Sequence, residues 1–164
     1  MMRKRGSIIA GYLALSALFF ALPVWPRPTA DEVMADFHAA VGRCEATLQD
    51  PLILHAHIVR NRVIEDIKDP AMDKRRYAIG FLGNVGAREA LPALRNILED
   101  ETEKDYFRAD ALESIFHIDG GEGQALAPRY SQVDNLLGWV AREILDGGTR
   151  FSKRSYIDAL LGRH

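Results

Sequence analysis

The stretch RRYAIGFLGNVGAREALPALRNILEDETEKDYFRADALESIFHIDG, residues 75–120, carries the strongest structural signal in this 164-residue chain. Sliding the segment along itself by 33 residues brings the same residue class back at five positions of one helical face. The aligned pairs are Arg75 with Arg108, Ala78 with Ala111, Ile79 with Leu112, Leu82 with Ile115 and Val85 with Ile118. A glycine turn and an Ala-Leu pair follow each copy. Such self-similarity predicts helical hairpins that stack, because one hairpin cannot bury its own apolar face.

A capping-box pattern marks the start of the helical body upstream of this segment. Thr29, with Glu32 three residues later, can satisfy two backbone donors at a helix amino terminus. Asp50-Pro51 is predicted to stop this first helix. Pro51 suits the first position of a second helix, which is predicted to continue to Asp69-Pro70. The apolar stripe predicted for the first helix is Val33, Phe37, Ala40, Val41, Cys44 and Leu48.

The pattern downstream of the repeat stays helical but becomes less regular. Pro128 is expected to interrupt the second helix of the second copy, and apolar spacing from Val133 to Ile144 predicts a further amphipathic helix. No alternating run bounded by turns occurs from residue 29 onward. The predicted fold is therefore all-α, a short α-solenoid of stacked helical hairpins that follows an N-terminal apolar signal or anchor helix.

Residues 75–120 resemble the HEAT-like repeats that are also found in phycobilisome lyases, and the resemblance extends over roughly residues 52–126. The matching residues are Arg75, Ala78, Leu82-Gly83, Gly86, Ala90, Leu94, Asp100, Arg108, Ala111 and Ile118. The resemblance implies a ladder in which an acidic residue of each inter-repeat turn pairs with an arginine of the next helix. Asp69 with Arg75 or Arg76, and Asp100 with Arg108, are the expected pairs. Such a ladder is architecture and not a catalytic site.

A basic triplet, Arg3-Lys4-Arg5, precedes a stretch without charged residues from Ile8 to Trp25. This layout is typical of a secretory signal. Residues 1–28 are therefore predicted to be a signal peptide or a signal-anchor transmembrane helix, and residues 29–164 the HEAT-like repeat domain. Because positive charge stays inside, the repeat domain is expected outside the cytoplasm, in the periplasm if the organism has two membranes.

Retention and cleavage of this apolar segment both stay open. The eighteen residues Ile8–Trp25 only just match the thickness of a hydrocarbon core, and Pro23 shortens the clean apolar run to fifteen, so length alone does not decide for a span. A cut after Ala30 would place Pro28 where cleavage needs a small residue, which weakens the case for cleavage. The expected product is either a single-pass anchored protein or a secreted or periplasmic one.

Charge and cysteine content exclude several classes of function. Residues 31–164 hold 17 basic and 23 acidic residues, a balance of −6 that opposes binding to a phosphate backbone, so nucleic acid is not an expected partner. Cys44 is the only cysteine, so neither an intrachain disulfide nor a thiolate metal site can form. Its helical register predicts that Cys44 is a small buried apolar residue.

Three groups of polar residues suggest chemistry, and a simpler explanation is preferred for each. His55 and His57 would point about 200° apart on one helix and could not converge on a metal. Asp110, Ser114 and His117 share a helical face, but one helix flank gives none of the enclosure that a catalytic triad needs. The acidic run over residues 99–105 lacks the spacing of a calcium loop and is predicted to be a solvated turn. No catalytic, cofactor or metal residue is therefore assigned.

Two further sequence features concern glycine and the carboxyl end. Gly80, Gly83 and Gly86 are spaced by three, which predicts close helix contact with Gly86 as a terminator. After Gly147-Gly148 the chain is basic and amphipathic, with Arg150, Lys153, Arg154 and Arg163. That segment is predicted to form a helix that caps the stack, with docking on anionic lipid as the alternative.

The sequence predicts a non-catalytic binding or scaffold module that presents a helical-repeat surface to a protein partner, with no small-molecule substrate and no cofactor. Tyr106 and Trp139 are candidate contacts, since aromatic side chains often anchor interfaces. Two alternatives stay open. The chain could be a structural subunit of an envelope complex, or, as the resemblance to lyases implies, an enzyme that handles a bilin pigment, which export argues against.

Overall fold

The computed structural model describes residues 27–41, 45–147 and 161, and every regular element within these ranges is a helix. The amino-terminal part comprises α2 (Ala30–Ala39), the 3₁₀ helix η1 (Glu45–Gln49), α3 (Asp50–Leu54) and α4 (Ala56–Asp66). The remainder comprises α5 (Arg75–Asn84), the 3₁₀ helix η2 (Arg88–Ala90), α6 (Leu91–Glu99), α7 (Asp105–Ile118), α8 (Gly120–Tyr130) and α9 (Leu136–Leu145). The all-α prediction is confirmed.

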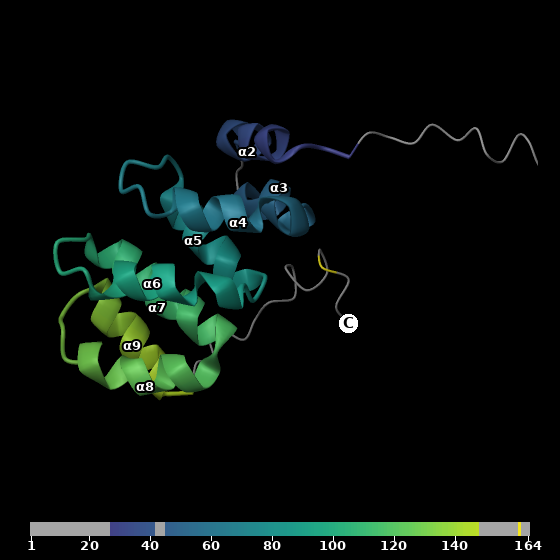
Figure 1. Ribbon diagram of the computed structural model, residues 1–164. Coiled ribbons are helices and arrows are strands. Elements are labelled where there is room, and N and C mark those ends of the chain that lie inside the picture. Colours follow the sequence, from purple (N-terminus) through teal and green to yellow (C-terminus); the bar gives the residue numbers. More distant parts are fainter. Residues whose placement is uncertain (1–26, 42–44, 148–160, 162–164) are drawn as a thin grey trace, which may run out of the picture.

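Helix α7 lies at the centre of a stack of helical hairpins (Figure 1). It packs against α5 and α6 of the preceding hairpin, against its own partner α8, and against α9. Five of its side chains are fully or almost fully buried in one continuous apolar core: Ala109, Ala111, Leu112, Ile115 and Ile118. The predicted stacking of successive hairpins is confirmed, since each helix covers the apolar side of its neighbour.

Two glycines let backbones approach where hairpins meet. A Cβ built on Gly83 of α5 would lie 2.8 Å from the Cα of Ser114 in α7. A Cβ built on Gly123 of α8 would lie 2.5 Å from the Cα of Phe116 in α7. Gly86 ends α5 with a φ of +67°, a conformation that residues with a side chain rarely adopt. The predicted roles of Gly83 and Gly86 are confirmed.

The turns that join successive hairpins have the same local structure. In the first, the Ala71 N–H donates to Asp69 Oδ1 at 2.8 Å, and in the second the Thr102 N–H donates to Asp100 Oδ1 at 2.9 Å. An aspartate that bonds the backbone two residues on fixes a turn without help from the rest of the fold. In the repeat, Arg108 is equivalent to Arg75, the first residue of α5. Helix α7 starts one turn earlier, at Asp105, and is longer than α5 for this reason.

The amino-terminal part differs from the sequence prediction. Helix α2 has the predicted capping box, in which Glu32 N–H donates to Thr29 Oγ1 at 3.2 Å, but it ends at Ala39. The prediction that one helix continues to residue 49 is wrong: Ala40 has left helical geometry with ψ 125°, and Val41, placed on the buried stripe, is 99% exposed. Cys44 lies outside the described residues.

The second predicted helix is divided, and Pro128 does not have the predicted effect. His55, with φ −119° and ψ 26°, separates α3 from α4. Pro128 lies inside α8, which continues to Tyr130, so the second copy does have its second helix. A proline removes one backbone donor and crowds the carbonyl four residues before it, a disturbance that the last turn of a helix can absorb.

No helix among the described residues is long and apolar enough to cross a membrane. The apolar run Ile8–Trp25 and the basic stretch after Gly147 lie outside those residues, so the predicted signal or anchor and the predicted terminal cap remain predictions.

Candidate functional site

A half-open polar cavity of about 190 Å³ lies between η1, α5 and α7. We call it the α5–α7 groove. It is lined by Gln49, Arg76, Tyr77, Gly80, Asn84, Asp110, Glu113, Ser114 and His117. Because its walls come from successive helical units, the groove exists only when the hairpins are stacked.

Polar pairs cross the groove from one element to the next. Arg76 of α5 contacts Asp110 of α7 through two hydrogen bonds, Nε to Oδ2 at 2.7 Å and Nη2 to Oδ1 at 3.2 Å. The Asp110 side chain is only 13% exposed. Asn84 Nδ2 donates to Gln49 Oε1 at 2.9 Å, which ties α5 to η1. A two-pronged guanidinium–carboxylate contact fixes orientation as well as distance, so the groove has a defined shape.

Asp110, Ser114 and His117 line the half-open groove, so η1 and α5 partly cover a helix flank that was predicted to have no enclosure. The contacts do not form a catalytic triad. The buried Ser114 hydroxyl donates to Ile79 O at 3.0 Å, so its single proton points at a backbone carbonyl. His117 Nε2 lies 3.8 Å from Glu113 Oε1 on its own helix. Ser114 therefore ties α7 to α5 and is not an activated nucleophile.

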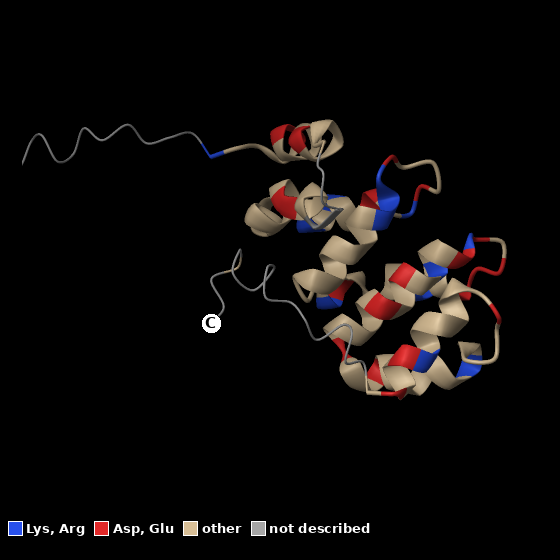
Figure 2. Ribbon diagram, turned by 180° about the vertical axis from the view of Figure 1, so that it is seen from behind, with Lys and Arg blue, Asp and Glu red and all other residues tan. Residues whose placement is uncertain are grey.

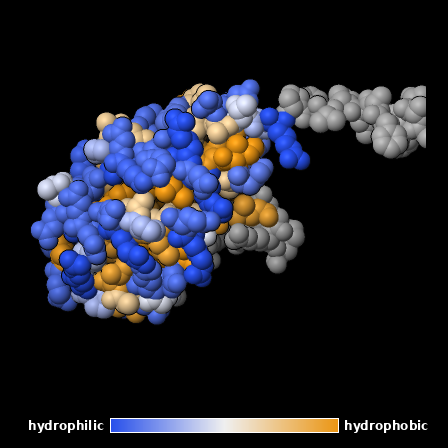
Figure 3. All heavy atoms as spheres, viewed as in Figure 1, coloured by the Kyte–Doolittle hydropathy of each residue, from blue (hydrophilic) through white to orange (hydrophobic). Residues whose placement is uncertain are grey.

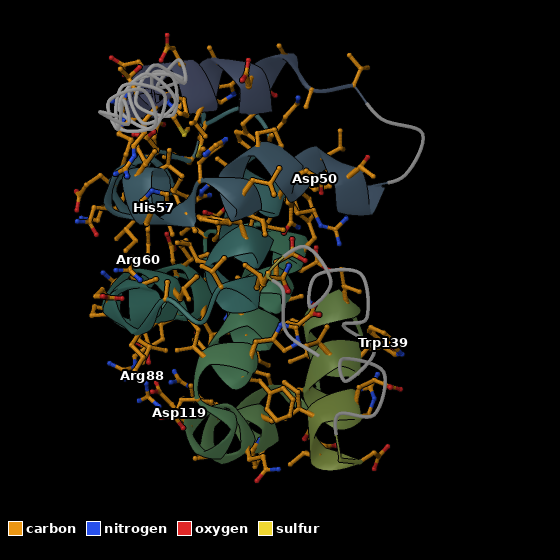
Figure 4. All side chains as sticks on the ribbon, turned by 90° about the vertical axis from the view of Figure 1, so that its right-hand side faces the viewer. Asp50, His57, Arg60, Arg88, Asp119 and Trp139 are labelled. Carbon is orange, nitrogen blue, oxygen red and sulfur yellow. The ribbon has the colours of Figure 1, made fainter. Side chains whose placement is uncertain are left out.

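The other predicted groups are dispersed by the fold. His55 sits at the break between α3 and α4, so it does not share a helix with the exposed His57, which points outward in Figure 4. Within the described ranges, no group of three or more His, Cys, Asp or Glu side chains is placed to hold a metal ion. In the acidic turn that follows α6, visible in Figure 2, Asp100 makes local contacts, whereas Glu103 contacts Arg75 of the preceding hairpin.

Asp100 illustrates those local contacts. It accepts hydrogen bonds from the hydroxyl and the backbone N–H of Thr102 at 2.7 and 2.9 Å. These two bonds lower the pKa of Asp100, and the charge of Arg108 lowers it a little further. The expected Asp100–Arg108 pair therefore acts only as a weak electrostatic attraction, and the main role of Asp100 is to fix its turn.

The expected pairing of Asp69 with Arg75 or Arg76 is wrong, because Arg75 reaches the next turn. Arg75 is only 3% exposed, and its Nη1 contacts the carboxylate of Glu103. Its Nε donates to Ile67 O at 2.7 Å, and its guanidinium lies 4.8 Å from the ring centre of Phe107. One buried cation thus joins the end of α4 to the turn before α7, a contact that sequence spacing alone did not reveal.

A comparison with known families agrees with this geometry. Residues 74–100, which span α5, η2 and α6, match the family model of the PBS lyase HEAT-like repeat. The hairpin formed by α5 and α6 is therefore similar to a HEAT-like repeat, and the neighbouring helices stack on it. No curated protein and no solved structure matches the chain. HEAT-like repeats generally serve as protein-interaction scaffolds.

The stack of hairpins also has ion pairs along one edge. Arg60 of α4 lies 3.2 Å from Glu89 of η2, and Arg88 of η2 lies 3.7 Å from Asp119 at the start of α8. Arg60, Arg88 and Asp119 follow one another down this edge in Figure 4. Each pair links consecutive hairpins, and since the side chains are well exposed, each adds little stability.

The two aromatic residues that were predicted to contact a partner are both half-buried in the HEAT-like stack. The Tyr106 ring lies 4.5 Å from that of Phe107, between centres, and the Lys104 ammonium lies 5.7 Å from its centre. Trp139 packs against the apolar core at the edge opposite the ion pairs (Figure 4). Their buried portions are explained by packing, so the α5–α7 groove is the better candidate site.

Proposed function

We propose that the chain is a non-catalytic binding or scaffold module that is held outside the cytoplasm and presents the α5–α7 groove to a protein partner. One observation carries this proposal: polar side chains from three separate elements converge on a half-open surface that depends on repeat stacking. Repeat proteins bind through such composite surfaces, because stacking creates extended concave faces.

The size and polarity of the groove favour a protein over a small molecule. Pockets for small molecules usually measure roughly 300–1,000 Å³, are mostly apolar and enclose most of their ligand. The groove holds about 190 Å³, is open along one side and is lined largely by polar groups. The face of the molecule drawn in Figure 3 is likewise mostly hydrophilic, with apolar spots between the helices. Such a mixture is typical of interfaces between proteins that also exist apart.

The extracytoplasmic location is part of the same proposal. It is supported by the charges of Arg3-Lys4-Arg5, which precede the uncharged run Ile8–Trp25. Alkaline phosphatase fused after residue 164 should be active, because that enzyme folds only where disulfides form. An inactive fusion that is nevertheless produced at full length would contradict the location but would leave the groove proposal intact.

A matched pair of double variants tests the groove. Arg76→Ala with Asp110→Ala removes both partners of the groove ion pair. Arg95→Ala with Glu122→Ala removes a similar two-pronged pair outside the groove. Affinity purification from gently solubilised membranes measures how much partner protein is recovered. We expect the groove variant to recover at least about tenfold less partner, as is typical when residues at the centre of an interface are truncated. The other variant should keep that protein.

Equal recovery of the partner by both double variants would contradict a role for the groove, provided that circular dichroism shows both to be folded. Salt then separates the two forms of the proposal. A transient binder held by polar contacts should lose its partner as ionic strength rises. A structural subunit should keep its partner at fixed stoichiometry.

A further inference from the structure

Lys74, just before α5, has an unusual backbone conformation. Its φ of 56° and ψ of 21° place it in the left-handed region, and no other described residue except glycine has a positive φ. This region is disfavoured for residues with a Cβ. A lysine stays in this region only where its surroundings hold it.

The side chain of Lys74 supplies those contacts. Its Nζ donates to three backbone carbonyls, Phe37 O at 2.8 Å, His38 O at 2.7 Å and Ala40 O at 2.6 Å. Nζ also lies 5.7 Å from the centre of the Phe37 ring. An ammonium group has three donors, and all three are used here. The acceptors lie at the carboxyl end of α2, where carbonyls lack helical partners and the helix dipole is negative.

Little else of a polar kind holds α2 in place. Val33, Met34 and Phe37 bury their side chains in the core, and α2 packs on α3 and α4. The ion pairs of α2 are long: Arg62 lies 3.6 Å from Asp31, and His38 lies 3.8 Å from Asp73. Exposed pairs of this kind contribute little. Lys74 therefore provides the one close, multiply bonded polar tie between α2 and the described part of the stack.

We propose that Lys74 is a latch whose charge keeps α2 docked, so that neutralising this side chain releases α2 while α5 to α9 stay folded. Helix α2 lies over α3 and α4 at one end of the stack (Figure 1) and follows directly on the amino-terminal segment. If that segment is the tether, which rests on the proposed function, release of α2 lets residues 29–40 extend by up to roughly 40 Å while η1 stays in the wall of the groove. The latch then sets how far the groove can reach from the membrane.

Hydrogen exchange of the full chain tests the latch without reference to the membrane. Lys74→Met keeps the length of the side chain but removes its charge. Lys74→Gly also removes the charge but relieves the left-handed backbone. The matched control is Lys68→Met, because Lys68 lies close by in the same turn and pairs only with the exposed Glu65 at 2.6 Å.

We expect amides of residues 33–39 to exchange about tenfold faster in both Lys74 variants, with α7 amides unchanged, because local opening needs only the ties of α2 to break. Lys68→Met should change neither region. The latch is refuted if α2 amides keep their rate in Lys74→Met, or if α2 and α7 accelerate together. It is refuted also if Lys74→Gly protects α2, since backbone strain rather than charge would then dominate. None of these outcomes depends on whether the chain is tethered or binds a protein.

Discussion

The centre of the stack and its amino-terminal arm are stabilised in different ways. Helix α7 packs on four other helices, and at Gly83 and Gly123 it meets neighbouring backbones closely. The arm, α2 to α4, consists of short helices separated by a break at His55, and α2 is held by one lysine and three buried apolar residues. Shape complementarity therefore dominates at the centre, whereas polar ties to backbone carbonyls matter more in the arm.

This difference has a consequence for how each region should respond to change. Substitutions at the centre disturb several helices together and should lower the stability of the whole stack. Substitutions in the arm should act locally, because α2 can open without unpacking α7. The largest effects are therefore expected at buried contacts of the centre, and the smallest at exposed groups of α2.

Arg75→Met should lower the free energy of unfolding by about 3–5 kcal/mol, because Glu103, only 11% exposed, would lose its cation inside the fold. Urea denaturation followed by circular dichroism measures this change. Arg62→Met removes an exposed arginine of the arm and should leave the midpoint in place. If both variants shift the midpoint of urea denaturation equally, the buried pair stabilises the fold no more than the exposed one.

Gly123→Ala should destabilise the stack by about 1–3 kcal/mol, since its Cβ would overlap the backbone of α7 at Phe116 and force a shift. Gly121→Ala, two residues earlier in the same helix, meets nothing closer than 3.5 Å and should be neutral or slightly stabilising. Thermal unfolding of both proteins measures the difference. If Gly123→Ala unfolds at the wild-type temperature, the close approach of α7 and α8 is wrong.

In two helix caps, a side-chain oxygen accepts a hydrogen bond from the backbone N–H three residues on. Removing either cap should destabilise the protein, but over regions of different extent. Thr29→Ala removes the cap of α2 and Asp119→Ala the cap of α8, and each should cost about 0.5–2 kcal/mol. Hydrogen exchange should show faster exchange confined to α2 in the first variant, and spread over α7 and α8 in the second. Faster exchange of α7 amides in Thr29→Ala would contradict the claim that the arm opens independently.

The smallest predicted effect is a local pH dependence of α2. Hydrogen bonds from the backbone N–H of Thr29, and then from its hydroxyl, lower the pKa of Glu32. Because the folded pKa lies below the unfolded one, the capping contribution is fully present above the unfolded pKa. It is lost as pH falls through the folded pKa.

Nuclear magnetic resonance titration of the side-chain carboxyl groups measures this pKa. Thr29→Ala removes the hydroxyl but keeps the backbone N–H, so it should raise the pKa of Glu32 only part of the way toward its ordinary value. The same substitution should leave the pKa of Asp100 low, because Thr102 and not Thr29 bonds that carboxylate. An unchanged pKa of Glu32 in Thr29→Ala would contradict the capping box.

The sequence predicted the repeat better than the arm, for a physical reason. The repeat of Ala78, Leu82 and their equivalents at 33 residues reflects burial that every hairpin shares, so it can be recognised in one chain. The carbonyls at the end of α2 bind Lys74, which lies 34 or more residues away along the chain. Helical spacing continued past Ala39 in the sequence, but periodicity carries no information about a distant cation.

The groove was only half predictable for the same reason. Asp110, Ser114 and His117 could be placed on one helix face from spacing alone. The groove is completed by Arg76, Asn84 and Gln49. Stacking brings these residues to α7 from distant parts of the chain, so spacing within one helix does not reveal them. Arg75 was expected to pair with Asp69, but its guanidinium contacts Glu103 in the turn before α7, a contact between hairpins that helical spacing does not indicate.

Native-state hydrogen exchange of the unmodified full chain tests most directly the claim that α7 organises the stack and that α2 is an independently opening arm. The account predicts that amides of α7 exchange most slowly, that those of α5 and α9 follow closely, and that those of α2 exchange faster by orders of magnitude. Amides of α2 that exchange as slowly as those of α7 would contradict it.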